Sequence, residues 1–84
     1  MPLSAMAAKA VQIVVNKASV DLPDHHTTGY AIKEAAIRRG VEIELSFQLS
    51  VKHGPHQTQI VGDTEPITVH AGLEFVAVAG DDNS

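Results

Sequence analysis

Cysteine is absent from the 84-residue chain, and aromatic residues are limited to Tyr30, Phe47 and Phe75. Without cysteine there is no disulfide, no thiolate-bound zinc and no enzyme mechanism that passes through a protein thioester. The core must therefore be aliphatic, since Ala, Val, Ile and Leu supply most of the 44% of residues that are hydrophobic. A chain of this length forms one domain and buries only about 60% of its unfolded surface.

Positive charge and long hydrophobic runs are also scarce. Six Lys and Arg stand against ten Asp and Glu, a net charge of −4, whereas nucleic-acid binding needs a basic surface. No apolar run approaches the about 20 residues that cross a bilayer. In residues 1–9 the single charge, Lys9, follows the apolar stretch, which reverses the order of a signal peptide. We expect a cytoplasmic protein with a flexible N-terminus at residues 1–9 and no membrane or nucleic-acid partner.

Sequence motifs of catalysis and metal binding are missing. There is no Gly-x-Ser-x-Gly elbow, no phosphate-binding glycine loop and no pair of carboxylates in a plausible cleft. His25-His26 and His53-x-x-His56 have imidazole ligands to offer, but both groups fall in predicted loops and no thiol or carboxylate completes a motif. We expect these histidines to be solvated, and the protein to have no metal, no cofactor and no enzymatic activity.

The first half of the chain predicts a hairpin followed by a helix. Val11–Val15 is rich in β-branched residues, the polar stretch 16–19 predicts a turn, and residues 20–22 predict a second strand. Thr27 or Thr28 then offers a side-chain oxygen to cap a helix over residues 29–39. Gly40 suits the left-handed end of that helix, whose buried stripe we assign by helical spacing to Ile32, Ala35 and Ala36.

The second half predicts extended structure. Apolar residues alternate with polar ones between residues 42 and 52, which predicts a half-buried strand carrying Ile43, Leu45, Phe47, Leu49 and Val51. Residues 57–61 predict a brief strand, and residues 67–69 a short extended element. Residues 73–79 are nearly all apolar, which favours a strand with neighbours on both sides, paired with Val11–Val15. The expected fold is α+β, with one main helix packed across one face of a mixed four- to five-stranded sheet.

Strand alternation predicts which side chains of the strands at residues 11–15 and 73–79 point to each face of the sheet. We expect one set of side chains to face the helix, namely Val11, Ile13, Val15, Leu73, Phe75 and Ala77. The uncovered face then carries Val14, Val76 and Val78, which with Ala79 form a candidate partner-binding surface. A shift of one residue would exchange the two faces, and isolated exposed valines are common on folded proteins.

Three segments resemble the bacterial multiubiquitin-type domains of the ubiquitin-like β-grasp fold. They are the first strand Val11–Asn16, the Thr-Gly helix start in Thr28–Lys33, and the Gly-x-x-Phe turn before the last strand in Ile67–Phe75. The similarity covers about residues 10 to 80. Members of this family often carry several domains in tandem, so this chain would be a single-domain relative, with a domain at 10–80 and a tail at 81–84.

The resemblance implies a modifier that other enzymes process and attach to targets. Gly80 stands where the apolar strand gives way to the polar tail Asp81-Asp82-Asn83-Ser84. The implied partners are a ubiquitin-activating-type enzyme, a ubiquitin-conjugating-type enzyme and a JAB-type metallopeptidase that cleaves the Gly80–Asp81 bond, in systems linked to defence against phage. Glycine allows the close approach that a narrow enzyme cleft requires.

Two other functions fit the same sequence features. A non-covalent β-grasp adaptor would use its surface and keep its tail, and a glycine followed by polar residues is also what many frayed C-termini look like. A sulfur carrier would activate a C-terminal glycine as a thiocarboxylate, but such carriers usually end directly in a glycine pair. Here a single glycine precedes residues 81–84.

Overall fold

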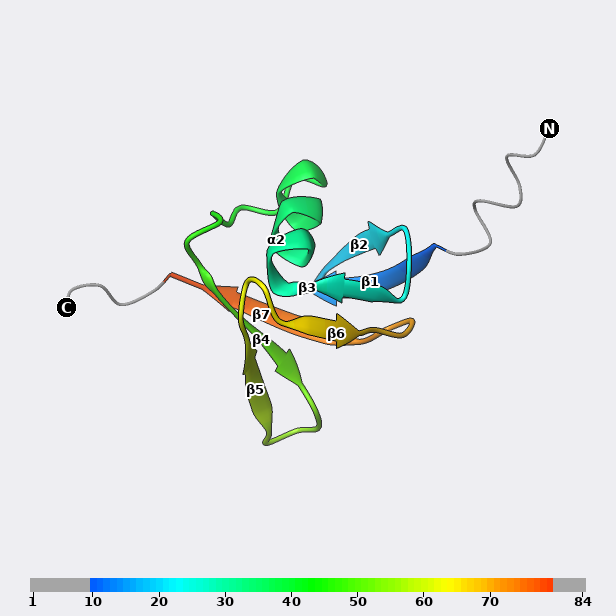
Figure 1. Cartoon of the computed structure of the whole chain (residues 1–84). Coiled ribbons are helices and arrows are strands. Elements are labelled where there is room, and N and C mark those ends of the chain that lie inside the picture. The colour runs from blue at the N-terminus through cyan, green and yellow to red at the C-terminus, as the bar shows by residue number, and fades with distance from the viewer. Residues whose placement is uncertain (1–9, 80–84) are drawn as a thin grey trace.

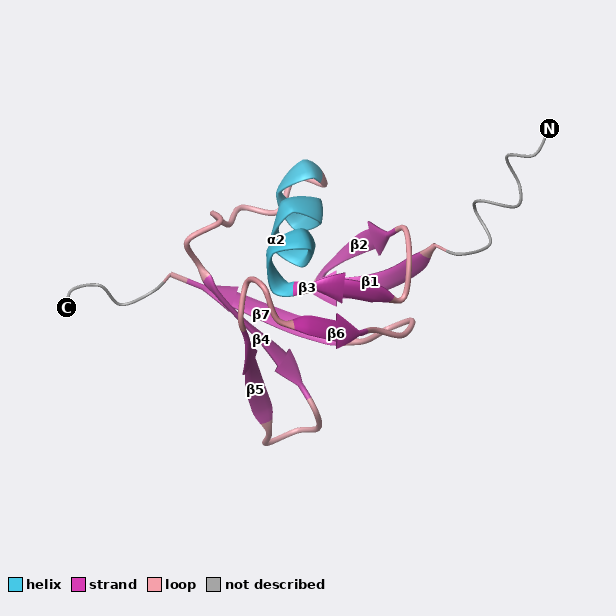
Figure 2. Cartoon of the chain, in the orientation of Figure 1, coloured by secondary structure: helices cyan, strands magenta, loops and turns pink. Residues whose placement is uncertain are grey.

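The computed structural model describes residues 10–79, which contain seven strands and one helix. In chain order these are β1 (Val11–Val15), β2 (Ala18–Leu22), β3 (His26–Thr28), α2 (Gly29–Arg38), β4 (Gln48–Lys52), β5 (Thr58–Val61), β6 (Pro66–Thr68) and β7 (Glu74–Val78). Five strands form a sheet in the order β2-β1-β7-β4-β5, and β3 pairs with β6 in a second, small sheet (Figure 2). Helix α2 lies across one face of the large sheet (Figure 1). This is the predicted α+β ubiquitin-like β-grasp arrangement.

The two most apolar strands, β1 and β7, lie side by side in the sheet. They pair in parallel, with Val15 aligned to Phe75, and β7 pairs on its other side antiparallel to β4, with Ala77 opposite Leu49. The prediction that the last strand has neighbours on both sides is therefore confirmed. A strand enclosed in this way can be apolar on both faces more readily than an edge strand.

The hairpin between β1 and β2 has a tighter turn than the sequence predicts. Val15 pairs directly with Ala18, which leaves a turn of only Asn16 and Lys17, with φ of 51° and 71°. Positive φ at both central residues defines the type I′ hairpin turn, whose twist matches that of the flanking strands. Ala18 and Ser19, predicted to be in the turn, belong to strand β2.

Helix α2 begins at Gly29 as predicted and ends at Arg38, one residue before the predicted end. Thr28 is the N-cap, and its Oγ1 accepts a hydrogen bond from the Ala31 N–H at 3.3 Å. Ile32 and Ala36 are fully buried, and Gly40 follows the helix with a φ of 101°. Ala35, the third residue of the predicted buried stripe, is half-buried.

The predicted strand over residues 42–52 is wrong in its first half, because β4 begins only at Gln48. Residues 45–47 turn instead, and the Leu45 and Phe47 carbonyl oxygens both accept hydrogen bonds from the Lys33 ammonium, at 2.6 and 2.8 Å. In a regular strand these two carbonyls would be about 7 Å apart, too far to share one nitrogen in this way. Leu45 is exposed as a result.

The small sheet was not predicted as a pair of strands. His26 lies opposite Thr68 and Thr27 opposite Ile67, and the Val69 N–H extends the contact by donating to the His25 carbonyl at 2.8 Å. The extended element predicted at residues 67–69 is present, but His26–Thr28 was assigned only to a loop and a helix cap. Three residues are too few to show a strand period.

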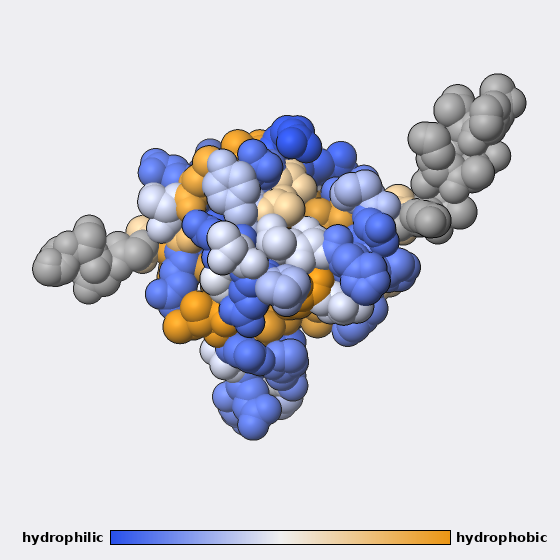
Figure 3. All heavy atoms as spheres, viewed as in Figure 1, coloured by the Kyte–Doolittle hydropathy of each residue, from blue (hydrophilic) through white to orange (hydrophobic). Residues whose placement is uncertain are grey.

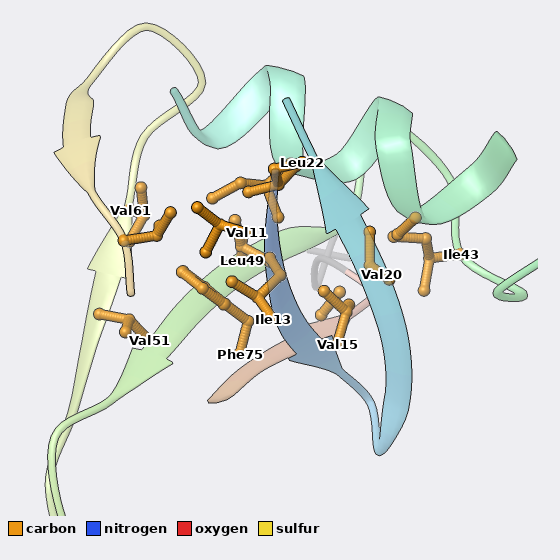
Figure 4. Close-up of a cluster of buried hydrophobic side chains, with 14 residues drawn as sticks. Val11, Ile13, Val15, Val20, Leu22, Ile43, Leu49, Val51, Val61 and Phe75 are labelled. Atoms are coloured by element: carbon orange, nitrogen blue, oxygen red, sulfur yellow. The ribbon is translucent and has the colours of Figure 1, made fainter. Parts of the chain in front are cut away.

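The core is aliphatic apart from one aromatic ring. Phe75 is buried among valine, isoleucine, leucine and alanine side chains that the strands and α2 direct into the space between them (Figure 4). The two other aromatic residues are not fully buried, since Phe47 packs partly against the core and Tyr30 is exposed. In the described range 10–79, no helix is long and apolar enough to cross a membrane.

Candidate functional site

The strand that leads to the predicted processing site is β7. It ends at Val78, which lies opposite Gln48, and Ala79 follows it and is exposed. Gly80 and Asp81, the residues of the predicted scissile bond, lie outside the described residues. The structure describes the strand that precedes this bond, β7, which lies between β1 and β4 in the middle of the sheet.

A side chain from the first hairpin reaches this end of β7. Asn16 Oδ1 accepts a hydrogen bond from the Ala77 N–H at 2.8 Å, and Asn16 Nδ2 donates to the Ala77 carbonyl at 3.0 Å. From the sequence, Asn16 was predicted to lie in the hairpin turn, with no role for its side chain. A contact between residues 61 positions apart leaves no local pattern by which it could have been found.

The predicted facing of the two central strands is confirmed. Val11, Ile13 and Val15 are buried, as are Phe75 and Ala77, and Leu73 packs partly against the core. The alternate residues point to the face of the large sheet opposite α2, which we call the open face.

Three of the predicted partner-binding residues lie on the open face. Val14 and Val76 are half-buried, and Val78 is 50% exposed. Ala79 lies beyond the end of β7, so the strand alternation that groups the valines does not include it.

Ile60 on the edge strand β5 adds to the open face and was missed. Val76 lies opposite Ser50, and Ser50 lies opposite Ile60, so the three side chains project to the same side of the sheet. Ile60 is 59% exposed, although its neighbour Val61 is buried. The first three residues of Thr58–Val61 are exposed and only Val61 is buried, so the segment shows no alternation that could have identified Ile60.

A hollow of about 330 Å³ lies on the open face. Its lining includes the apolar Val14 and Val76 and the charged Lys17, Lys52 and Glu74. The Lys52 ammonium lies 3.5 Å from the Glu74 carboxylate, and both side chains remain largely exposed. An apolar centre with a polar, solvent-accessible rim is the layout of protein–protein interfaces.

Lys33 is the buried lysine among those described, with 3% of its surface exposed. Its ammonium donates to the Leu45 and Phe47 carbonyls and lies 2.6 Å from the Asp63 carboxylate. These contacts use the three N–H bonds of the ammonium. Lys17 and Lys52 are exposed, so they are the lysines of residues 10–79 whose amines another protein can reach.

The histidines stay dispersed. Within residues 10–79, no group of three or more His, Asp or Glu side chains is placed to hold a metal ion. The surface seen in Figure 3 is largely hydrophilic, with smaller hydrophobic patches between the polar side chains.

Comparison with known protein families gives one finding. The sequence model of the family described as Multiubiquitin matches residues 11–81, which is nearly the whole chain. Comparisons with curated proteins and with solved structures give no match.

Proposed function

The chain belongs to the multiubiquitin family, and from this we propose that it is a ubiquitin-like protein modifier and not an enzyme. It would be matured by cleavage after Gly80 and then conjugated to target amines through the Gly80 carboxylate. The proposed setting is the bacterial cytoplasm, in defence against phage.

Maturation is a hydrolysis carried out by a JAB-type metallopeptidase. Water activated by the zinc ion of that enzyme attacks the Gly80 carbonyl carbon, the bond to the Asp81 nitrogen breaks, and a proton passes to the leaving amine. The products are a chain that ends in the Gly80 carboxylate and the released peptide of residues 81–84.

Conjugation then uses the new carboxylate as the electrophile. In a ubiquitin-activating-type enzyme, the carboxylate attacks the α-phosphate of ATP and displaces pyrophosphate, and a cysteine thiolate of the enzyme displaces AMP to give a thioester. A ubiquitin-conjugating-type enzyme accepts the thioester by thiol exchange, and a target amine displaces its thiolate to form an amide. The catalytic groups all belong to the partners, which agrees with the absence of cysteine here.

The observation that carries the proposal is the family match itself. It covers β7 and continues to residue 81, so that it includes both Gly80 and Asp81. The central position of β7 supports this, because a rigid strand presents the tail at a defined point of the domain.

Intact mass spectrometry tests the maturation step. The purified protein is incubated with the JAB-type peptidase of its host, beside a Gly80→Glu variant. We expect the parent to lose residues 81–84 and the variant to stay intact. An unchanged parent mass, with a peptidase active on another substrate, would refute the maturation step.

The open face is the surface we propose for partner recognition, with Val14, Val76, Val78 and Ala79 in contact with the partner. Val76→Lys should weaken binding to the activating enzyme, measured by calorimetry, and leave the thermal unfolding midpoint nearly unchanged. Ser46→Lys adds the same charge at an exposed turn and should bind normally. Equal affinities of the two variants for the activating enzyme would show that the open face is not the binding surface.

A second candidate function, that of a non-covalent adaptor, would also use the open face. An adaptor would lose its partner with Val76→Lys but would function normally with Gly80→Glu, whereas a modifier requires both residues. A sulfur carrier would be distinguished by its mature mass, since one carboxylate oxygen would be replaced by sulfur.

A further inference from the structure

The parallel pairing of β1 with β7 continues past the end of β1 through a side chain. The Val14 N–H donates to the Leu73 carbonyl at 2.9 Å, and the Asn16 N–H donates to the Phe75 carbonyl at 3.0 Å. The next carbonyl in this series is that of Ala77, and it accepts from Asn16 Nδ2 at 3.0 Å.

The backbone of Asn16 cannot continue the ladder, because it turns into the hairpin with a φ of 51°. A carboxamide has the same donor and acceptor groups as a peptide unit. The Asn16 side chain therefore replaces one peptide unit of the missing strand, since it also accepts from the Ala77 N–H at 2.8 Å. On its other side, β7 is paired to β4 through Ala77 and Val78.

We propose that Asn16 is a positioning residue that fixes where β7 ends and the C-terminal tail begins. The link to processing rests on the proposed function of Gly80. With Ala77 bonded to Asn16, the three residues that follow it can carry the scissile bond no farther than about 10 Å from this fixed point, the length of three extended residues. If the strand loosened back to Phe75, this reach would grow to about 17 Å. The two hydrogen bonds between the Asn16 side chain and Ala77, which we call the clamp, thus limit the positions at which an enzyme can bind the scissile bond.

The chain supplies matched variants for this proposal, because both turn residues have positive φ. Asn16→Gly keeps the turn and removes the carboxamide, while Lys17→Gly makes the same kind of change one residue later and keeps the Asn16 contacts. Asn16→Asp keeps an acceptor for the Ala77 N–H but has no N–H to donate to the Ala77 carbonyl.

Amide hydrogen exchange tests the clamp directly. We expect Asn16→Gly to accelerate exchange at Ala77 about tenfold relative to Val15, with Asn16→Asp intermediate and Lys17→Gly unchanged. The ratio to Val15 separates local loosening from a loss of global stability, which would accelerate both amides. An unchanged ratio in Asn16→Gly would overturn the clamp.

Cleavage kinetics test its role in processing. We expect Asn16→Gly to lower kcat/KM of the peptidase several-fold relative to Lys17→Gly, which changes the same turn but keeps the Asn16 contacts. Parent and Asn16→Gly cleaved at equal rates, despite faster exchange at Ala77, would overturn the positioning role and leave the proposed function intact. If the parent is not cleaved at all, the proposed maturation fails and the positioning role fails with it, whereas the exchange experiment still decides the clamp.

Discussion

Replacing Lys33 by methionine tests whether the hydrogen bonds and the ion pair of its ammonium hold residues 45–47 and Asp63 against helix α2. The Lys33 ammonium is buried, donates to the Leu45 and Phe47 carbonyls, and pairs with Asp63. Methionine keeps a side chain of similar length and apolar character but cannot donate hydrogen bonds. The substitution therefore removes the polar contacts and preserves most of the packing.

The size of the effect follows from what each partner loses. Breaking a fully buried ion pair costs about 3–5 kcal/mol, mostly from the charge left behind. Here the Asp63 side chain is 52% exposed and remains hydrated, so this part of the cost is small. The two carbonyls lose their donor at about 1–3 kcal/mol for each group left without a partner. We expect Lys33→Met to lower the free energy of unfolding by about 2–4 kcal/mol, a large share of the about 5–15 kcal/mol typical of a domain.

Urea and thermal unfolding, followed by circular dichroism, measure this loss. In a domain of this size, the expected change lowers the unfolding midpoint by about 10 °C or more. Lys52→Met is the matched control, because Lys52 is exposed and its contact with Glu74 is 3.5 Å long, which predicts a loss below about 1 kcal/mol. Equal losses for the two variants would refute the reasoning, since burial and hydrogen bonding of Lys33 would then add nothing.

Two further predictions concern backbone contact and amine access. A Cβ on Gly29 would lie 2.3 Å from the Gly62 carbonyl oxygen, so Gly29→Ala should lower the free energy of unfolding in urea by about 1–3 kcal/mol. Gly62→Ala is the control, because a Cβ there would have no neighbouring atom closer than 3.7 Å, and it should change stability little. A larger loss for Gly62→Ala than for Gly29→Ala would contradict the contact. In the folded protein, an amine-acetylating reagent should modify Lys17 and Lys52 but reach Lys33 only in urea, as peptide mass spectrometry will show. Acetylation of all three lysines at one rate under native conditions would contradict the burial of Lys33.

The strands at the centre of the sheet were predictable because their burial is periodic and local. Val11, Ile13 and Val15 alternate in the sequence, as do Phe75 and Ala77, and each set points to the core. The helix was predictable for a similar reason, since its cap and its left-handed end depend on residues next to it.

The errors arise where a distant group determines the local structure. Ile43, Leu45 and Phe47 have the spacing of a strand, but the ammonium of Lys33 draws two carbonyls together and turns the chain. Asn16 has the sequence signature of a turn residue, while its side chain completes a strand pairing 61 residues away. Neither long-range contact is encoded in a local period.

The candidate site was predictable in part. The valines of the open face follow from alternation once β1 and β7 are paired, and Ile60 was missed because the orientation of the edge strand was not predicted. The Gly80–Asp81 bond was chosen from the change of composition and from the family resemblance, and it remains a prediction.

The most direct test of the account is a search for the conjugate in cells. The chain, tagged at its N-terminus, is expressed in its native host, purified under denaturing conditions and digested with an endoprotease that cleaves after glutamate. Because Glu74 is the last glutamate before Gly80, a conjugated target should carry a branch of residues 75–80, ending in Gly80, on a lysine. We expect these branched peptides with the parent chain and none with Gly80→Glu. Recovery of only the intact 84-residue chain, with its tail present and no branched peptide, would contradict the account.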